Sequence, residues 1–232
     1  MRRLLLWDID GTLIRGGGVG SRALTQAASI VAGRPIDGNA VMMHGKTDPQ
    51  IFAEAFRAAE IAEDEIVKLL PPAMAEAERI MAEAEEELRA RGSVIEGVLD
   101  LLTRMDALPN VRQTLLTGNL VGNAAVKMAA FDLARFFDVE VGAYGTDHAD
   151  RNELVPIALQ RVAELRGERY DANEVWVIGD TPNDFACAHA AGVHCLLVAT
   201  GNIPIAELQT LDADAVYPDL TNTDEVVALL TA

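Results

Sequence analysis

The sequence predicts an α/β fold, in which a Rossmann-like parallel sheet carries helices on both faces and an all-helical segment is inserted after the first strand. Three observations favour this fold. Short apolar runs recur along the chain, and each is followed by Gly, Asp, Thr or Asn. Segments with helical periodicity separate these runs, and strands that alternate with helices are typical of a parallel sheet. One long stretch near the N-terminus contains helical segments and no convincing strand.

The apolar runs have the length of buried strands, and five of them are expected: Leu4–Trp7, Thr114–Leu116, Val139–Val141, Val175–Ile178 and Cys195–Val198. In an open parallel sheet the ligand crevice lies at the carboxyl ends of the strands. The polar residues that close the runs are therefore expected to converge: Asp8 and Asp10, Thr117 to Asn119, Asp147, and Asp180 to Asp184.

The helical stretch covers residues 19–92, with helices expected at Ser21–Ala32, Asp48–Ala59 and Asp64–Arg91. Pro71-Pro72 should kink or split the last of these. We predict a core domain formed by residues 1–18 and 93–232, and a helical cap domain formed by residues 19–92. The run Gly16–Gly18 is interpreted as a hinge into the cap, although it is equally a flexible loop.

Composition limits the function. The 232 residues are 50% apolar and 24% charged, with a formal net charge of −17. A surface this acidic repels nucleic acid and anionic membranes. No run reaches the ~20 apolar residues of a membrane span. The expectation is a cytoplasmic protein, a monomer or homodimer, with neither nucleic acid nor membrane as a partner.

Two carboxylates, Asp8 and Asp10, follow the first apolar run and point the same way along an extended chain. Without a counter-charge they would repel each other, and one would hold a proton. A hard divalent cation resolves this, and Mg²⁺ prefers oxygen ligands. Asp-Gly also marks turns, so the spacing alone is explained equally well by turn or helix caps.

A second acidic group follows Val175–Ile178, where Asp180 and Asp184 lie four residues apart. Helix capping accounts for one of them, but not readily for two acidic pairs at one sheet edge. At another strand end, Thr117 and Gly118 can offer a hydroxyl and free backbone N–H groups to an anion. Thr-Gly-Asn is also an ordinary turn, so this signal is weak alone.

Taken together, these stretches resemble the haloacid dehalogenase-like (HAD) phosphohydrolase superfamily. Asp8–Thr12 is similar to its first motif, Thr117 to the strand-end Thr or Ser of its second, and Gly179–Asp184 to its acidic fourth motif. The motifs occur in order at predicted strand ends, and the helical insert resembles the family's cap. The resemblance spans nearly the whole chain, and within the superfamily it is to phosphoglycolate phosphatase-like members.

The resemblance implies a Mg²⁺-dependent phosphatase that acts on a small phosphorylated metabolite. Asp8 would attack phosphorus and form an aspartyl-phosphate, and Asp10 would protonate the leaving group and then activate water. Mg²⁺ would be held by Asp8, Asp180 and the backbone carbonyl of Asp10, with Asp184 orienting that sphere. Phosphoryl oxygens would be bound by Thr117, Gly118 and Asn119.

The third motif departs from the family pattern. It is usually a Lys that screens charge between nucleophile and phosphate, but the region Gly145–Pro156 contains no Lys. Arg151 stands at about the right place and keeps the charge, with a different reach and geometry. The alternative is Lys127, interpreted as a surface residue with an apolar stem. We predict Arg151 as a catalytic and phosphate-binding residue. Asp147 and His148 either stabilise this loop or touch the metal shell or Arg151.

Within the predicted cap, the segment His44–Pro49 interrupts two helices. Thr47 or Asp48 is a natural N-cap before Pro49. His44 and Lys46 remain as candidates that close over a second anionic group of the substrate.

Three other functions compete with the phosphatase. A phosphomutase similar to β-phosphoglucomutase would return the phosphoryl group to substrate. A phosphonatase is also considered, for which Lys46 is the obvious amine. A non-catalytic phospho-acceptor or binding module is the alternative of a different class, although receiver domains are shorter and have no helical cap.

Overall fold

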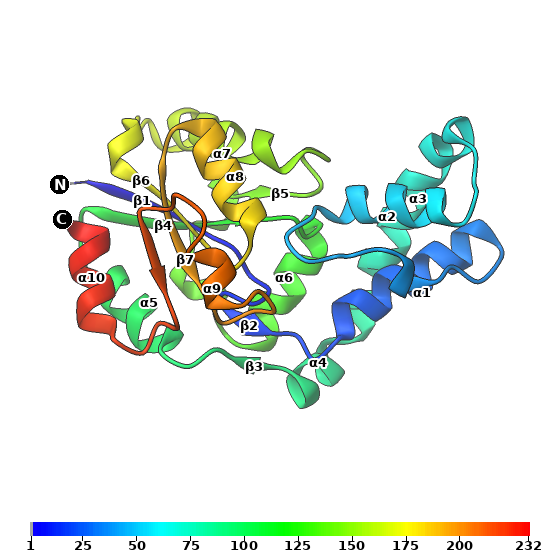
Figure 1. The fold of residues 1–232 in the computed structure, drawn as a ribbon, viewed down its shortest axis with the longest axis horizontal. Coiled ribbons are helices and arrows are strands. Elements are labelled where there is room, and N and C mark those ends of the chain that lie inside the picture. Colours follow the sequence, from blue (N-terminus) through cyan, green and yellow to red (C-terminus); the bar gives the residue numbers. More distant parts are fainter. Residues whose placement is uncertain (1) are drawn as a thin grey trace.

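The computed structural model describes residues 2–232 and contains the expected α/β fold (Figure 1). A six-stranded parallel sheet has the order β5-β4-β1-β6-β7-β8. The first strand is central, because its register pairs Leu4 with both Arg112 and Val175. The strands are β1 (Arg3–Trp7), β4 (Val111–Thr117), β5 (Ala143–Tyr144), β6 (Val175–Gly179), β7 (His194–Val198) and β8 (Ala215–Tyr217).

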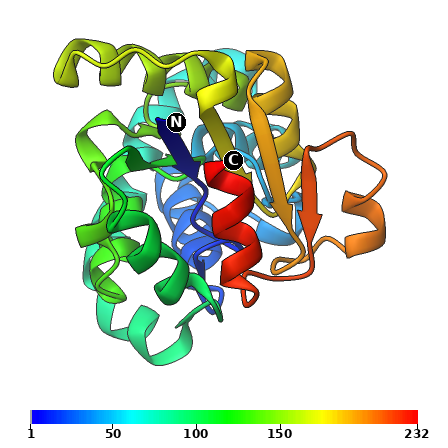
Figure 2. The same ribbon diagram turned by 90° about the vertical axis from the view of Figure 1, so that its left-hand side faces the viewer.

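Helices cover both faces of this sheet, and alternate residues of β1 divide the core between them. Leu5 and Trp7 belong to one buried cluster, with side chains from α5 (Val98–Asp106), α6 (Val121–Ala130) and α10 (Thr223–Thr231). Leu4 and Leu6 belong to the other, with α7 (Leu154–Arg166), α8 (Pro182–Ala191) and α9 (Ile205–Leu208). The C-terminal helix ends close to the start of β1 (Figure 2), where Arg3 donates to the carbonyl of Leu230 at 3.0 Å.

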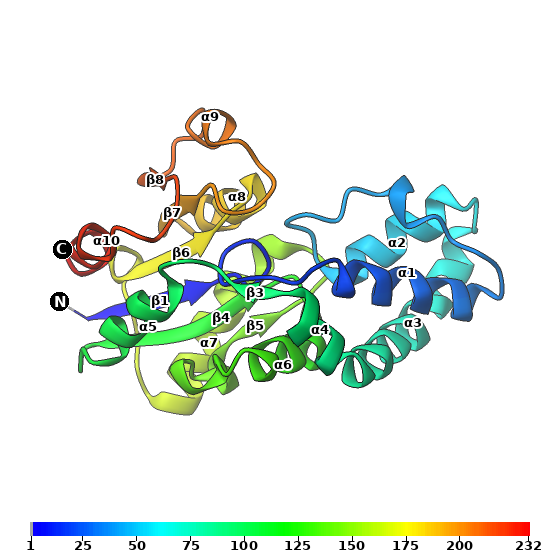
Figure 3. The ribbon, with the colours of Figure 1, turned by 90° about the horizontal axis from the view of Figure 1, so that it is seen from below.

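Four α-helices and the 3-10 helix Gly38–Ala40 separate β2 (Ile14–Arg15) from β3 (Ser93–Val94), and these two short strands pair antiparallel. The helices are α1 (Val19–Ala32), α2 (Asp48–Ala58), α3 (Glu63–Glu83) and α4 (Glu85–Arg91). They lie together beyond the carboxyl ends of the strands (Figures 1 and 3). Their apolar cluster includes Phe52, Phe56 and Ile66, and Leu120, which precedes α6, also belongs to it.

The connections to these helices run side by side. Gly17 and Gly18 have φ values of 57° and 79°, which only glycine adopts without strain. A Cβ on Gly17 would lie 2.6 Å from the carbonyl oxygen of Arg91. Glycine is therefore required where the two connections touch, and we propose that they form the boundary between a core and a cap.

Two expectations about the elements are wrong. Val139–Val141 forms a 3-10 helix instead of a strand, and the edge strand is β5, two residues later. The expected helix Asp64–Arg91 breaks at Ala84, while α3 runs through Pro71 and Pro72. Both prolines are exposed, so the carbonyls left without helical donors face water. Within residues 2–232, no helix has the length and apolarity that crossing a membrane requires.

Candidate functional site

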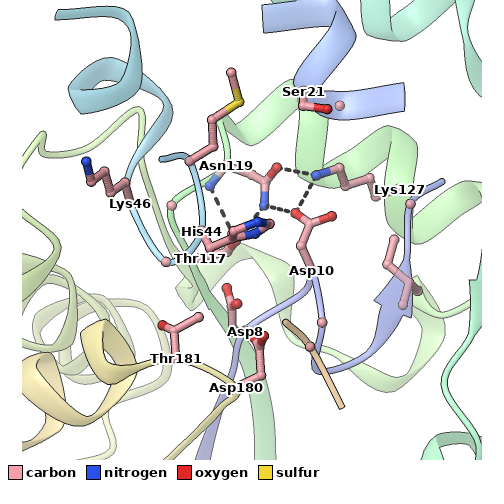
Figure 4. A pocket seen from close by; sticks show the side chains of 18 of the residues that line it. Asp8, Asp10, Ser21, His44, Lys46, Thr117, Asn119, Lys127, Asp180 and Thr181 are labelled. Carbon is pink, nitrogen blue, oxygen red and sulfur yellow. Dashed lines mark hydrogen bonds and ion pairs between the residues drawn. The ribbon is translucent and has the colours of Figure 1, made fainter. Parts of the chain in front are cut away.

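Most of the strand-end residues converge on one cavity of about 380 Å³, but Asp147 and Asp184 are not among the residues that line it. Asp8 follows β1, Thr117 ends β4 and Asp180 follows β6, and all three line it (Figure 4). The opposite wall comes from α1 and from the loop before α2, which contributes His44. The cavity therefore lies between the edge of the sheet and the inserted helices. It is also lined by Asp10, Lys46, Gly118, Asn119, Lys127 and Arg151.

Arg151 lies at the inner end of the cavity and pairs with two carboxylates. Its Nη2 is 3.1 Å from Asp8 Oδ1 and also donates to Asp184 Oδ1 at 2.5 Å. All three side chains are almost completely buried. Burial raises the pKa of Asp8 to about 6, against the opposing effect of Arg151. The structure thus places a cation beside the predicted nucleophile, at the position that the sequence favours.

Asp180 completes a group of three acidic residues. Ligand oxygens of Asp8, Asp180 and Asp184 lie within 4.8 Å of one another. Burial, followed by the charges of Asp184 and Asp8, raises the pKa of Asp180 to about 9. A Cβ on Gly11 would lie 2.3 Å from Asp180 Oδ2, so the chain leaves space for this carboxylate. Clustered hard oxygen donors of this kind fit Mg²⁺.

Asp184 has its oxygens occupied by protein groups. Oδ1 accepts from Arg151, and Oδ2 accepts from the backbone N–H and hydroxyl of Thr181 at 3.0 and 2.7 Å. The carboxylate therefore orients Arg151 and the start of α8. The predicted role of Asp184 in orienting the metal sphere remains a prediction.

The turn after β4 is closed by its own hydrogen bonds. Thr117 Oγ1 accepts from the backbone N–H of Asn119 at 3.3 Å and from its Nδ2 at 2.8 Å. The carbonyl of Gly118 accepts from the backbone N–H of Asp48 at 2.7 Å. A Cβ on Gly118 would lie 2.1 Å from the carbonyl oxygen of Lys46. Thr117, Gly118 and Asn119 all line the cavity, and their predicted contacts with phosphate remain predictions.

Lys127 is not a surface residue, which corrects its sequence interpretation. Only 3% of it is exposed, and its ammonium donates to Asp10 Oδ2 and to Asn119 Oδ1 (Figure 4). Asn119 Nδ2 donates to the same Asp10 oxygen at 2.8 Å. Burial favours a higher pKa for Asp10, but the charge and hydrogen bonds of Lys127 and Asn119 outweigh it, so the pKa is lowered.

The loop before α2 docks on the segments that follow β4 and β5. Thr47 caps α2 as expected and also donates to the carbonyl of Ala149 at 2.6 Å. Asp48 is buried and accepts from the backbone N–H of Leu120 at 2.8 Å and from Asn123 Nδ2 at 3.1 Å. Arg151 Nη1 donates to the carbonyl of Gly45 at 3.3 Å. The sequence interpretation treated Asp48 as a cap alone, whereas its carboxylate ties the loop to α6.

The two cap candidates differ in their surroundings. His44 lies in the cavity, where its ring is within 3.0 Å of Asn202 Nδ2. Lys46 is paired with Glu54 of α2, and its side chain points away from Asp8 (Figure 4).

The other two polar residues of the third-motif region stabilise their loop. Asp147 pairs with Arg161 at 2.6 Å and accepts from the backbone N–H of Tyr144 at 2.9 Å. His148 Nδ1 accepts from the backbone N–H of Asp150 at 3.0 Å. Of the two interpretations left open by the sequence, these contacts favour the loop role.

Comparisons with known proteins agree with this geometry. A family model described as haloacid dehalogenase-like hydrolase matches residues 5–189. A phosphoglycolate phosphatase from Rhodospirillum rubrum is 27% identical over 230 residues, covering 96% of this chain and 89% of that protein.

Solved structures share the fold at lower identity. A hydrolase from Pseudomonas syringae has a TM-score of 0.70 at 18% identity, covering 99% of each chain. CbbY from Rhodobacter sphaeroides, in complex with phosphate, has a TM-score of 0.70 at 18% identity and 96% coverage of each chain. The family model extends from β1 to α8 and includes every strand-end carboxylate of the cavity. The chain therefore belongs to the haloacid dehalogenase-like hydrolase family.

Proposed function

We propose that this protein is a Mg²⁺-dependent phosphatase that hydrolyses a phosphomonoester of a small metabolite through an aspartyl-phosphate on Asp8. The observation that carries the proposal is the pairing of Asp8 with Arg151 beside the acidic group of Asp180 and Asp184. A carboxylate is an adequate nucleophile toward an anionic phosphate only if the negative charge is screened. Arg151 supplies one cation that screens this charge, and the acidic group could hold a metal ion as a second.

In this proposal, residues at different places in the cavity have different roles. Mg²⁺ would be held by Asp8, Asp180 and the backbone carbonyl of Asp10, and when bound it would screen the phosphoryl oxygens. Asp8 would attack phosphorus, while Asp10, at the open side of the cavity, would exchange protons with the leaving group and then with water. Phosphoryl oxygens would be bound by Thr117, Gly118, Asn119 and Arg151.

The cavity favours a small substrate, because it is about 380 Å³ and is covered by the inserted helices. His44 is the better of the two predicted cap contacts, since Lys46 is already paired with Glu54. The pairing of Lys46 also weakens the phosphonatase alternative, which needs a free amine. The name of the Rhodospirillum rubrum relative makes phosphoglycolate the first compound to test.

The test is phosphate release from a panel of phosphorylated metabolites and p-nitrophenyl phosphate, with Mg²⁺ and after EDTA treatment. Turnover should need Mg²⁺ and should disappear in Asp8→Asn, because an amide is a much poorer nucleophile. Asp64→Asn, on the exposed surface of α3, is the matched control and should retain full activity. An active Asp8→Asn variant would contradict the covalent mechanism. An isomerised sugar phosphate in place of free phosphate would identify a mutase.

A further inference from the structure

The buried lysine on α6 has an unusual partner. Lys127 is 4% exposed at its side chain, yet its ammonium pairs with Asp10, whose side chain is 45% exposed to the cavity. A buried ammonium is costly unless it is paired and fully hydrogen-bonded. Lys127 is paired with Asp10 Oδ2 and hydrogen-bonded to Asn119 Oδ1, so two of its three N–H donors have protein acceptors. The cation is therefore held inside the protein while the carboxylate faces the cavity.

Both donors to Asp10 use the same oxygen. Lys127 Nζ and Asn119 Nδ2 each donate to Oδ2, whereas Oδ1 has no hydrogen-bond partner among residues 2–232. A carboxylate fixed through one oxygen has a defined orientation. Because Oδ2 already accepts two hydrogen bonds, a proton on Asp10 is directed to Oδ1.

The first inserted helix closes over this pair. A Cβ on Gly20 of α1 would lie 3.3 Å from Lys127 Nζ and 3.5 Å from its Cε. A larger side chain at this position would press on the ammonium. The backbone of α1 therefore covers Lys127 closely, which keeps it against Asp10.

We propose that Lys127 is a positioning residue, which with Asn119 orients Asp10 so that Oδ1 exchanges a proton with the leaving group and then with water. This inference rests on the proposed function. As Asp8 Oδ bonds to phosphorus and the bond to the leaving oxygen breaks, the proton on Oδ1 passes to that oxygen. When a water oxygen then bonds to phosphorus and the Asp8 bond breaks, the water returns a proton to Oδ1.

This role separates Lys127 from Arg151. Arg151 contacts the nucleophile Asp8 at 3.1 Å, while Lys127 hydrogen-bonds to Asp10 and Asn119. The two cations are thus not alternatives for one position. Each serves a different carboxylate of the pair that follows β1.

The test compares two substrates of similar shape, phenyl phosphate and p-nitrophenyl phosphate. Phenolate is the poorer leaving group and depends more on proton donation, so its kcat/KM reports on the orientation of Asp10. Both are supplied to Lys127→Met in one competition assay, so that the amount of folded enzyme cancels from the ratio of kcat/KM values. Lys127→Gln, which keeps an amide donor, is measured in parallel, and Lys68→Met on exposed α3 is the matched control.

We expect the ratio of phenyl phosphate to p-nitrophenyl phosphate to fall at least about tenfold in Lys127→Met, in the same direction as in Asp10→Asn. It should fall less in Lys127→Gln and stay unchanged in Lys68→Met. If kcat/KM falls equally for both substrates in the two Lys127 variants, the lysine is only structural and the inference is wrong. A wild-type protein that releases phosphate from neither substrate with Mg²⁺ contradicts the proposed function itself.

Discussion

The cavity has two ends that treat their carboxylates in opposite ways. At the inner end, Asp8 and Asp180 are buried together, and burial raises the pKa values to about 6 and about 9 despite Arg151. At the outer end, Asp10 is half exposed, and Lys127 with Asn119 overcomes the effect of burial and lowers the pKa. The inner end thus has an excess of negative charge that favours a bound cation. At the outer end the charge of Asp10 is already balanced by Lys127, so this carboxylate needs only to be oriented.

The largest effect is expected from replacing Asp180, a carboxylate of the proposed metal site at the inner end. Asp180→Asn should remove a metal ligand, so that turnover falls below detection and added Mg²⁺ no longer stabilises the fold. In the wild type, Mg²⁺ at about 100 times its Kd should add roughly 2.7 kcal/mol to the free energy of unfolding. Urea unfolding with and without Mg²⁺ measures this difference. Equal stabilisation of both proteins would show that the metal binds elsewhere.

Arg151 gives the next largest effect. Arg151→Ala should lower kcat by roughly 10²–10³, because Asp8 and the phosphoryl oxygens lose a buried donor. Arg151→Lys keeps the charge but gives up the planar fork that reaches both Asp184 and the carbonyl of Gly45, so it should recover only part of the rate.

Comparing variants of Arg151 and Lys127 tests the contrast between the two ends of the cavity. Arg151→Ala should damage turnover of p-nitrophenyl phosphate far more than Lys127→Ala, since this substrate depends little on proton donation. Steady-state kinetics with matched protein concentrations gives the ranking. The reverse order would assign the main charge-screening role to Lys127.

The site residues that could be predicted from the sequence are those marked by their immediate sequence neighbours. Asp8, Asp10, Thr117 and Asp180 each follow a buried apolar run, and the parallel order of β4, β1 and β6 brings them together. Arg151 was also located from its place before a helix. The local signal failed for Val139–Val141, where β-branched residues form a 3-10 helix, because strand preference depends on pairing partners.

Lys127 and Asp48 were misread because their partners are distant in sequence. Lys127 contacts Asp10 across 117 positions, and its burial depends on the close approach of α1 at Gly20. Asp48 lies in a capping sequence that Thr47 explains by itself. A lysine among Ala and Met could have indicated a buried partner, but its spacing equally suits a solvent-exposed stem.

The smallest expected effect concerns Asp48, which fastens the loop before α2 to the start of α6. Burial raises the pKa of Asp48 to about 6 from 3.8, so between these values the folded state binds more protons than the unfolded state. Its contribution to stability is therefore fully present below about pH 4 and is lost as the pH rises through about 6. At about 1.4 kcal/mol per pKa unit, the loss is at most about 3 kcal/mol.

Asp48→Asn removes this titration while keeping a side-chain oxygen for the N–H of Leu120. The difference in free energy of unfolding between wild type and Asp48→Asn should decline from pH 4 to 6.5 and stay flat above it. Urea unfolding across that range measures it, and the exposed Asp64→Asn change should give a flat difference. A flat result for Asp48→Asn would mean that the two donors of α6 already hold Asp48 ionised. Asp48 would then resemble Asp10, whose pKa is lowered, and both would contrast with Asp8 and Asp180.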